Sequence, residues 1–391
     1  MPHLRNRYIY RLLRSKLKFS PVIAIQGARQ TGKSTLVRDI LQPTLKDSIY
    51  ITLDDKNKRN MAQDHPDTFL EQYSDKKTII IDEAQKSPEI FDAVKLNVDQ
   101  KRIPGKFILL GSTEFSQLTL IRESLTGRMS KIRLLPLCIA ETKSLPAESL
   151  SFKNLKNKNP RITRNDFLKY MERGGMPGIF AVRNDDERLS LIKDWIELII
   201  LRDVQQFKKT KIDSELCLDI LNQIAHLQEP NLPNITKQLK QNTKRVQTHL
   251  TILEQLFVIN HISPDIDSSG KKLYFLLDVG LANYFKAPYE RLLETSILQE
   301  LIAQKYYFEK NIEKITYYRS QKGNRIPFVV HLDDGEVVAI KIFSSEKIKL
   351  TELEILKSFY QKKKCTMMGL GPSEINFKKE NIHIFPWEII V

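Results

Sequence analysis

The chain has 391 residues, and a typical domain length of about 150 residues predicts two or three domains rather than one compact unit. Its 62 Lys and Arg outnumber its 47 Asp and Glu, and the net charge of +15 favours polyanionic partners such as nucleotides, nucleic acid or an acidic protein. A solvated, lysine-rich surface explains the same charge equally well. No apolar run reaches the roughly 18 residues that span a bilayer, and the start lacks the apolar core of a signal peptide. We therefore expect a soluble, cytoplasmic protein with reduced cysteines and no membrane partner.

A phosphate-binding pattern follows the first expected elements, a helix over residues 5–18 and a buried strand at VIAI. Gly27, Gly32, Lys33 and Ser34 fit the spacing G-x-x-x-x-G-K-[ST], and STLVRDIL behind them predicts a helix. Glycines let backbone amides wrap a phosphate, while Lys33 reaches the outer phosphates and the Ser34 hydroxyl ligates Mg²⁺. The predicted nucleotide-binding positions are Gly27, Ala28, Arg29, Gln30, Thr31, Gly32, Lys33, Ser34 and Thr35.

Two adjacent acids follow a second apolar run, in TIIIDEAQ. Residues 78–81 predict a strand buried on both faces, with Asp82 at its carboxyl end. Hydrolysis of a nucleotide needs a carboxylate for the metal and a group that orients water. We assign the first role to Asp82, together with Ser34, and the second to Glu83. A helix-capping Asp-Glu pair is the alternative, and the upstream phosphate loop makes it minor.

Three further polar residues are candidates for the same site. The strand KFILLGST ends in Ser112 and Thr113, where a hydroxyl can sense the γ-phosphate or simply end a turn. Arg128, in LTGRMSKIRLLPL, precedes another expected strand, RLLPL. It can neutralise transition-state charge on a neighbouring subunit's nucleotide, as an arginine finger does, or pair with a surface carboxylate. We favour the arginine finger, which would require a homo-oligomer if it acts in trans.

The middle of the chain is helical. The polar, lysine-rich stretch PAESLSFKNLKNKNPR marks a boundary, and GGMPG breaks the helices that follow. Three helices and a strand pair then give the order of a winged helix-turn-helix, whose second and third helices carry Lys237, Lys240, Lys244 and Arg245. These side chains are candidates for gripping DNA phosphates. A packing module beside the nucleotide-binding domain is an equally good interpretation.

The last hundred residues alternate helices and strands, with DDG at residues 333–335 as a hairpin turn. Taken together, the motifs resemble those of prokaryotic AAA-type ATP-binding proteins with a C-terminal domain of unknown function. The segments that carry the resemblance are GARQTGKSTL, YITLDD, IIIDEAQKSPEIF, LLGSTEFSQL, LTGRMSKIRLLPL, ERGGMPG, LRDV, LLDVGLANYF and YYR. It implies ATP rather than another nucleotide, a winged helix, and a C-terminal fold similar to PD-(D/E)XK nucleases.

The nuclease likeness is incomplete. Glu300 and Lys341 match its acidic and basic positions, but Pro327 stands where relatives have an Asp and Ala339 where they have a Glu. Neither replacement can bind a metal, so we expect a nuclease-like domain without nuclease activity. In it, Lys341 is structural or at most a phosphate contact.

The predicted fold class is α/β, with a P-loop AAA-type parallel-sheet domain over residues 1–142 and a helical linker over 143–212. A winged helix-turn-helix over 213–288 and a nuclease-like α/β domain over 289–391 complete it. The predicted function is Mg²⁺-dependent ATP binding with slow hydrolysis, coupled to DNA or protein binding. The alternative is a nucleotide-gated DNA-binding protein, or a scaffold for a protein partner, that binds ATP without turning it over.

Overall fold

The computed structural model describes residues 5–115, 125, 127–207, 212–309, 311–380 and 382–391. Contacts divide the chain into two compact units. One comprises Asn6–Pro136 with Gln255–Phe257, and the other comprises Arg5, Leu137–Glu254 and Val258–Val391. The end of the LLGSTEFSQL segment, residues 116–118, lies outside the described residues.

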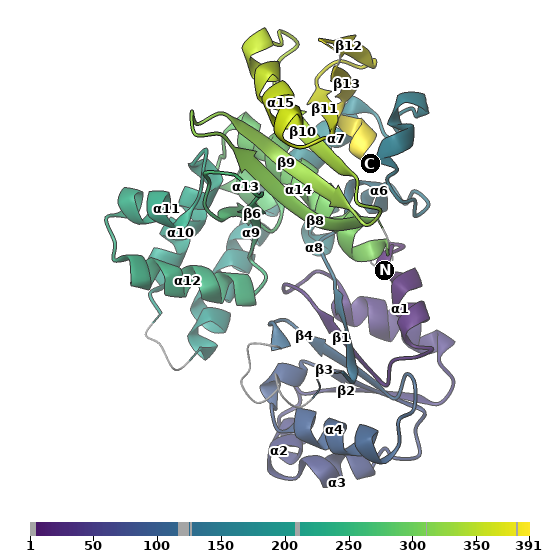
Figure 1. Cartoon of the computed structure of the whole chain (residues 1–391). Helices are drawn as coiled ribbons and strands as arrows, with labels where there is room; N and C mark the ends of the chain where they lie inside the picture. Colours follow the sequence, from purple (N-terminus) through teal and green to yellow (C-terminus); the bar gives the residue numbers. More distant parts are fainter. Residues whose placement is uncertain (1–4, 116–124, 126, 208–211, 310, 381) are drawn as a thin grey trace. The chain divides into compact units, whose positions relative to one another are not determined.

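The first unit is built on a parallel sheet of five strands, in the order β2-β3-β4-β1-β5. The strands are β1 (Val22–Gln26), β2 (Ser48–Thr52), β3 (Thr78–Asp82), β4 (Phe107–Gly111) and β5 (Met129–Arg133). Helical segments pack around this sheet (Figure 1). They are α1 (Ile9–Lys16), η1 (Thr35–Leu41), η2 (Gln42–Thr44), α2 (Lys56–Asp64), α3 (Pro66–Glu71), η3 (Ala84–Lys86) and α4 (Ile90–Gln100). The predicted α/β class with a parallel sheet is thus confirmed.

The strand order brings the carboxyl ends of three strands to one edge of the sheet. Every residue of β1, β3 and β4 is buried, as expected for apolar strands covered on both faces. β4 lies between β1 and β3, and all three run in the same direction. The loop after β1, the acids at the end of β3 and the hydroxyls after β4 therefore share the carboxyl edge, where ligands bind in open α/β sheets.

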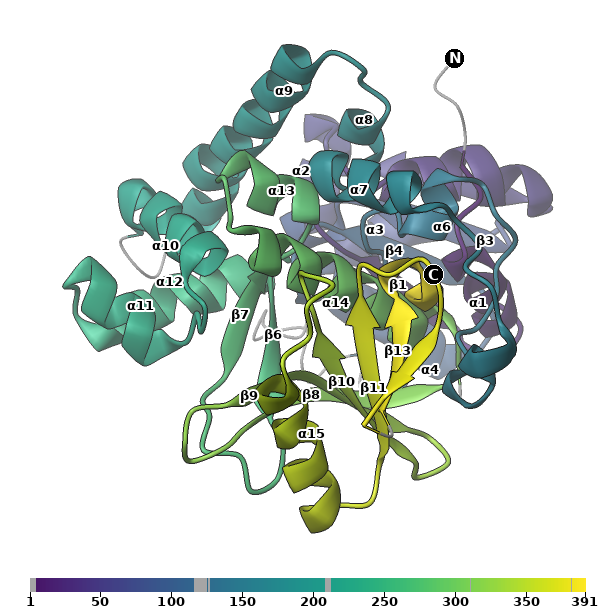
Figure 2. The same ribbon diagram turned by 90° about the horizontal axis from the view of Figure 1, so that it is seen from above.

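The second unit begins with helices and ends in a mixed sheet. Its helical segments are α6 (Ile139–Thr142), η5 (Phe152–Asn157), α7 (Arg164–Arg173), α8 (Pro177–Phe180), α9 (Asp185–Leu198), η6 (Ile199–Asp203), η7 (Val204–Gln206), α10 (Ser214–His226), α11 (Leu232–Leu239), α12 (Thr243–Gln255), α13 (Val279–Tyr284), α14 (Tyr289–Tyr307), α15 (Leu350–Lys362) and η8 (Trp387–Ile390). Figure 2 shows α15 beside the strands of the sheet. Its apolar residues Leu353, Leu356 and Phe359 join a core cluster with Val329 and Ala339 of that sheet.

The sheet of the second unit has eight strands, in the order β12-β13-β11-β10-β9-β8-β6-β7. The strands are β6 (Ile259–Pro264), β7 (Leu273–Leu276), β8 (Ile312–Arg319), β9 (Arg325–Leu332), β10 (Val337–Ile342), β11 (Thr366–Gly371), β12 (Phe377–Lys379) and β13 (Ile382–Pro386). The expected turn at residues 333–335 joins the antiparallel strands β9 and β10, with Gly335 at φ 85°.

Three helices and an antiparallel strand pair occur where a winged helix was expected: α10, α11, α12, β6 and β7. β6 also pairs in parallel with β8, through Ser263 and Pro264. The strand pair therefore shares a sheet with the C-terminal strands instead of standing apart as a wing. The winged-helix interpretation stays a prediction.

One expected strand and one expected helix differ from the structure. The strand predicted at RLLPL lies earlier, at Met129–Arg133. Beyond it, the Leu135 carbonyl accepts a hydrogen bond from the Arg7 side chain and Pro136 has no N–H to donate, so these two residues do not continue the strand. The helix expected over residues 5–18 is shorter, Ile9–Lys16.

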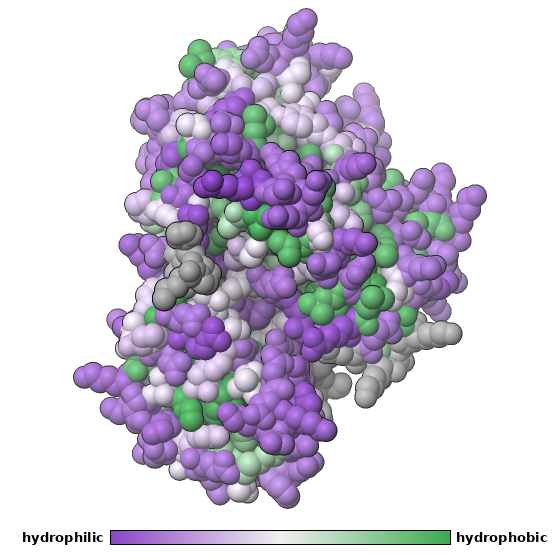
Figure 3. Space-filling model, turned by 180° about the vertical axis from the view of Figure 1, so that it is seen from behind, coloured by the Kyte–Doolittle hydropathy of each residue, from purple (hydrophilic) through white to green (hydrophobic). Residues whose placement is uncertain are grey.

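Within the part of the chain that the structure describes, no helix is both long and apolar enough to cross a membrane. The face in Figure 3 is mainly hydrophilic, with hydrophobic residues in small groups.

Candidate nucleotide-binding site

The loop after β1 is shaped by glycines. Gly32 has φ 90°, a conformation that side chains disfavour, and Gln30 also lies in the left-handed region, at φ 60°. A Cβ atom on Gly27 would stand 2.1 Å from the carbonyl oxygen of Leu134, so only glycine fits there. Thr35 begins η1, which is wound as a π-helix.

Lys33 occupies the centre of this loop. Its Nζ donates hydrogen bonds to the carbonyl oxygens of Gly27, at 2.9 Å, and Ala28, at 2.8 Å. The Thr31 hydroxyl also donates to the Ala28 carbonyl, at 2.9 Å. The side chain of Lys33 is thus a buried cation surrounded by loop backbone, where a phosphate oxygen can replace a carbonyl as its partner.

Asp82 joins the loop to β3 and β2. Its Oδ2 accepts a hydrogen bond from the Ser34 hydroxyl at 2.7 Å and another from the Tyr50 hydroxyl. Its Oδ1 accepts from the backbone N–H of Glu83 at 2.9 Å. Burial, and after it the hydrogen bond to Asp82, raises the pKa of Tyr50, which therefore stays a neutral donor.

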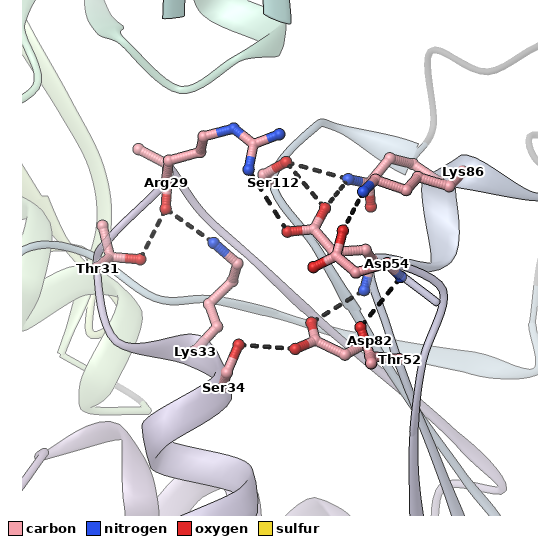
Figure 4. A network of polar contacts seen from close by, with 12 residues as sticks. Arg29, Thr31, Lys33, Ser34, Thr52, Asp54, Asp82, Lys86 and Ser112 are labelled. Carbon is pink, nitrogen blue, oxygen red and sulfur yellow. Dashed lines mark hydrogen bonds and ion pairs between the residues drawn. The ribbon is translucent and has the colours of Figure 1, made fainter. Parts of the chain in front are cut away.

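Glu83 is held by three side chains and by an unusual backbone. Its φ of 56° places a non-glycine residue in the left-handed region, a conformation that costs free energy and is often found at functional sites. Oε1 lies 3.7 Å from Nη1 of Arg29, while Oε2 accepts from Gln85 and, at 3.4 Å, from the Ser112 hydroxyl. In Figure 4 the side chain of Arg29 extends from the loop toward Ser112.

These residues fit a nucleoside triphosphate with Mg²⁺. The Ser34 hydroxyl and the Asp82 carboxylate offer two oxygens 2.7 Å apart, and oxygen is the ligand that Mg²⁺ prefers. Two buried polar atoms at the same edge, Oγ1 of Thr113 and Oε1 of Gln85, have no hydrogen-bond partner in the described structure. Unsatisfied buried polar atoms at a strand edge indicate a place where a ligand can bind.

The sequence did not reveal a further residue that shapes the loop, Arg7. Its guanidinium is buried and donates to the Thr31 carbonyl at 2.8 Å and to the Leu135 carbonyl at 2.6 Å. Arg7 therefore ties the phosphate loop to the segment after β5. Tyr50 was missed as well: it begins the segment YITLDD, but nothing in the sequence indicated a role for this tyrosine at the site.

Arg128 lies in a bidentate ion pair. Its Nε is 2.5 Å from Oδ1 of Asp99, and its Nη2 is 3.0 Å from Oδ2. Pairing with a carboxylate was the alternative to an arginine finger, and this pair is present. The arginine-finger role stays a prediction.

The four basic residues expected at a DNA interface differ in their surroundings. Lys237, Lys240 and Lys244 are exposed. Arg245, also exposed, donates to Asp213, which accepts the N-terminal amides of α10, and to Gln241 at 3.0 Å. Arg245 therefore has a structural partner that the sequence did not indicate.

Glu300 and Lys341, the two residues that match positions in the nuclease fold, both form hydrogen bonds with backbone groups. Glu300 accepts a hydrogen bond from the N–H of Ile139 at 2.7 Å, at the start of α6, and burial raises its pKa to about 8. The Nζ of Lys341 donates to the carbonyl of Arg325 at 3.1 Å. Pro327 stands in β9 and Ala339 in β10.

Comparisons with known proteins agree with this geometry. Residues 19–143 match the AAA domain family, and residues 164–290 and 289–390 match two families of unknown function, DUF8612 and DUF4143. The chain therefore carries an AAA-type P-loop ATPase domain, a nucleotide-binding domain, followed by C-terminal domains of unknown function.

Two relatives of this chain are uncharacterized proteins, and one similar solved structure is an ATPase. The relative from Mycobacterium tuberculosis is 25% identical over 262 residues, which are 66% of this chain and 54% of that protein, so the chain spans about half its length. The relative from Methanocaldococcus jannaschii is 22% identical over 90% of this chain and 81% of its own. A Walker-type ATPase of Pyrococcus abyssi has 16% identity and a TM-score of 0.41, covering 72% of this chain and 96% of its own.

Proposed function

We propose that the protein binds Mg²⁺-ATP in the loop after β1 and hydrolyses it slowly. The observation that carries the proposal is the 2.7 Å hydrogen bond between the Ser34 hydroxyl and Asp82, with Glu83 next in the chain. A metal-binding pair and a base thus stand at the edge where the loop would hold the phosphates. The preference for ATP rests on the similarity to AAA domains.

The residues suit in-line attack of water on the γ-phosphate. Lys33 would bind the outer phosphate oxygens, and Ser34 and Asp82 would hold Mg²⁺, which would offset phosphate charge. Glu83 orients the water and accepts its proton as the oxygen bonds to γ-phosphorus. The bond from γ-phosphorus to the β–γ bridging oxygen breaks, and the products are ADP and inorganic phosphate. The hydroxyl of Ser112, which donates to Glu83, is our candidate for a contact with the γ-phosphate.

Phosphate release and nucleotide binding by the purified chain test this proposal. Lys33→Ala should abolish binding, whereas Glu83→Gln should keep binding and lose turnover, because an amide cannot take the proton. Glu71→Gln, an exposed acid at the end of α3, is the matched control and should change neither. Loss of binding in Glu83→Gln equal to that in Lys33→Ala would contradict the assignment of Glu83.

A second candidate function is nucleotide-gated DNA binding through α11 and α12. It is supported by three exposed lysines, Lys237, Lys240 and Lys244, on helices next to a strand pair, and by the net charge of +15. Lysines that neutralise DNA phosphates release counterions, so affinity should fall steeply with salt.

The contacts of the four basic residues decide which variants are suitable for testing DNA binding. Arg245→Glu would place a carboxylate beside Asp213 and disturb the start of α10, so it should be avoided. Lys237→Glu/Lys244→Glu should weaken duplex binding and reduce its salt dependence, whereas Lys169→Glu, exposed on α7, should not. No binding at low salt, with or without ATP, would remove this candidate and leave a protein partner or scaffold role.

A further inference from the structure

Arg29 is a second cation in the phosphate loop, four residues before Lys33. Its side chain extends from the loop toward the end of β3, where Nη1 lies 3.7 Å from Oε1 of Glu83 (Figure 4). Both side chains are largely buried, with exposures of 15% for Arg29 and 14% for Glu83. The guanidinium therefore stands between the loop and the residue proposed to activate water.

The charges of the site balance without a nucleotide. Lys33 and Arg29 supply two positive charges, and Asp82 and Glu83 supply two negative ones. Lys33 is partnered by backbone carbonyls, but Arg29 is partnered by the carboxylate of Glu83. A triphosphate adds negative charge to the loop and so competes for this guanidinium.

The Arg29–Glu83 pair is of a kind that a phosphate can replace. At 3.7 Å it is an ion pair rather than a short charge-assisted hydrogen bond. An arginine can bind phosphate through two parallel N–H groups, which is a stronger arrangement. After the exchange, Glu83 keeps Gln85 and Ser112 on Oε2, and its Oε1 becomes available to water.

We propose that Arg29 reads the terminal phosphate of a bound nucleoside triphosphate, by moving its guanidinium from Glu83 to that phosphate. A diphosphate has no group at this position, so Arg29 stays on Glu83. The site then favours triphosphate over diphosphate, and Glu83 becomes available as a base only when the substrate is complete. This inference rests on the proposed nucleotide-binding function.

Binding measurements with two probes test the inference without relying on turnover. The probes are Mg²⁺ with AMP-PNP, a triphosphate that resists hydrolysis, and Mg²⁺ with ADP, each titrated by calorimetry. Arg29→Ala should weaken AMP-PNP binding by about 10- to 100-fold, the size of a lost charge-assisted hydrogen bond, and change ADP binding by less than about twofold. Equal weakening of both probes would mean that Arg29 only shapes the loop, and no change in either would also overturn the inference.

Glu83→Gln supplies a second test with Arg29 intact. Because glutamine does not hold the guanidinium by charge, this variant should bind AMP-PNP about three- to tenfold more tightly than the unchanged chain. Glu83→Gln should not bind ADP more tightly than the unchanged chain does. The double variant Arg29→Ala/Glu83→Gln should not bind AMP-PNP more tightly than Arg29→Ala does. A gain that persists in the double variant overturns the exchange. If variants without Arg29 fail to fold, the absence of any gain in Glu83→Gln overturns it by itself.

Failure of the inference differs from failure of the proposed function. If the unchanged chain binds neither AMP-PNP nor ADP, the proposed nucleotide-binding function fails, and the inference falls with it. If it binds both and Lys33→Ala binds neither, the proposed binding function stands. The Arg29 variants then decide the inference alone.

Discussion

Tyr50 and Ser34 donate hydrogen bonds to the same carboxylate oxygen, Oδ2 of Asp82. Tyr50 comes from β2 and Asp82 from the neighbouring strand β3, while Ser34 comes from the phosphate loop. If Ser34 turns its hydroxyl toward Mg²⁺, Tyr50 remains to hold the carboxylate in place. Tyr50 is thus a positioning residue for the proposed metal site.

Tyr50→Phe should lower Mg²⁺ affinity or ATP turnover by about 10- to 100-fold, a typical effect of losing a partner that orients a metal ligand. Titrating Mg²⁺ into the ATP-bound variant separates a change in metal affinity from a change in maximal rate. Tyr73→Phe, whose ring packs edge-on against Phe69, is the matched control and should behave like the unchanged chain. Equal Mg²⁺ dependence in both variants would remove Tyr50 from the site.

Arg7 should be needed to keep the loop ready for nucleotide. Its loss removes one buried hydrogen-bond donor each from the carbonyls of Thr31 and Leu135, which costs about 1–3 kcal/mol. Arg7→Ala should therefore lower both the unfolding temperature and the affinity for ADP. Arg11→Ala, exposed on α1, should change neither. Unchanged ADP affinity in Arg7→Ala would show that the loop does not depend on this contact.

The sequence predicted the parts of the site whose signals are local. The loop, the strand before it and the Asp82–Glu83 pair each follow from neighbouring residues, since glycine spacing and apolar runs report local backbone needs. Parallel strands then bring the carboxyl ends together, which is why Ser112 also reaches Glu83.

Long-range side-chain contacts could not be predicted in this way. Tyr50 contacts a residue 32 positions away, and Arg7 contacts one 128 positions away. Neither tyrosine in a strand nor arginine in a basic segment signals such a partner. The same applies to Arg245, whose pair with Asp213 depends on how α12 packs against the start of α10.

Arg128 can be tested as an arginine finger by mixing two inactive proteins. We expect Arg128→Ala to lose turnover by about 10³-fold, within the range for such arginines. Glu83→Gln is inactive for a different reason and keeps Arg128. If Arg128 acts on a neighbouring subunit, a mixture of the two variants should recover part of the activity.

Asp99→Ala is the control for the ion pair of Arg128. It breaks the pair without removing the arginine and should leave turnover intact. If Asp99→Ala and Arg128→Ala have the same small effect, and the mixture gains nothing, Arg128 serves only as the partner of Asp99.

Glu300 should make the stability of the second unit depend on pH. Burial raises its pKa in the folded chain to about 8, whereas an exposed Glu has a pKa near 4.5. Between these values the folded chain keeps a proton that the unfolded chain has lost, so rising pH favours unfolding, by at most about 1.4 kcal/mol per pH unit. The stability that neutral Glu300 contributes to the folded chain is fully present below pH 4.5 and is lost as the pH rises through about 8.

Glu300→Gln isolates this effect, because glutamine does not titrate and its Oε1 can still accept the N–H of Ile139. Urea unfolding at pH 5, 6, 7 and 8 should show the variant gaining stability relative to the unchanged chain as the pH rises. Asp278, whose pKa is raised to about 6, is present in both proteins and cancels in the difference. Glu290→Gln, exposed on the same helix, should give a flat difference. A flat difference for Glu300→Gln would mean that Glu300 is ionised in the folded chain, and the N-terminus of α6 would then face a carboxylate instead of a neutral acid.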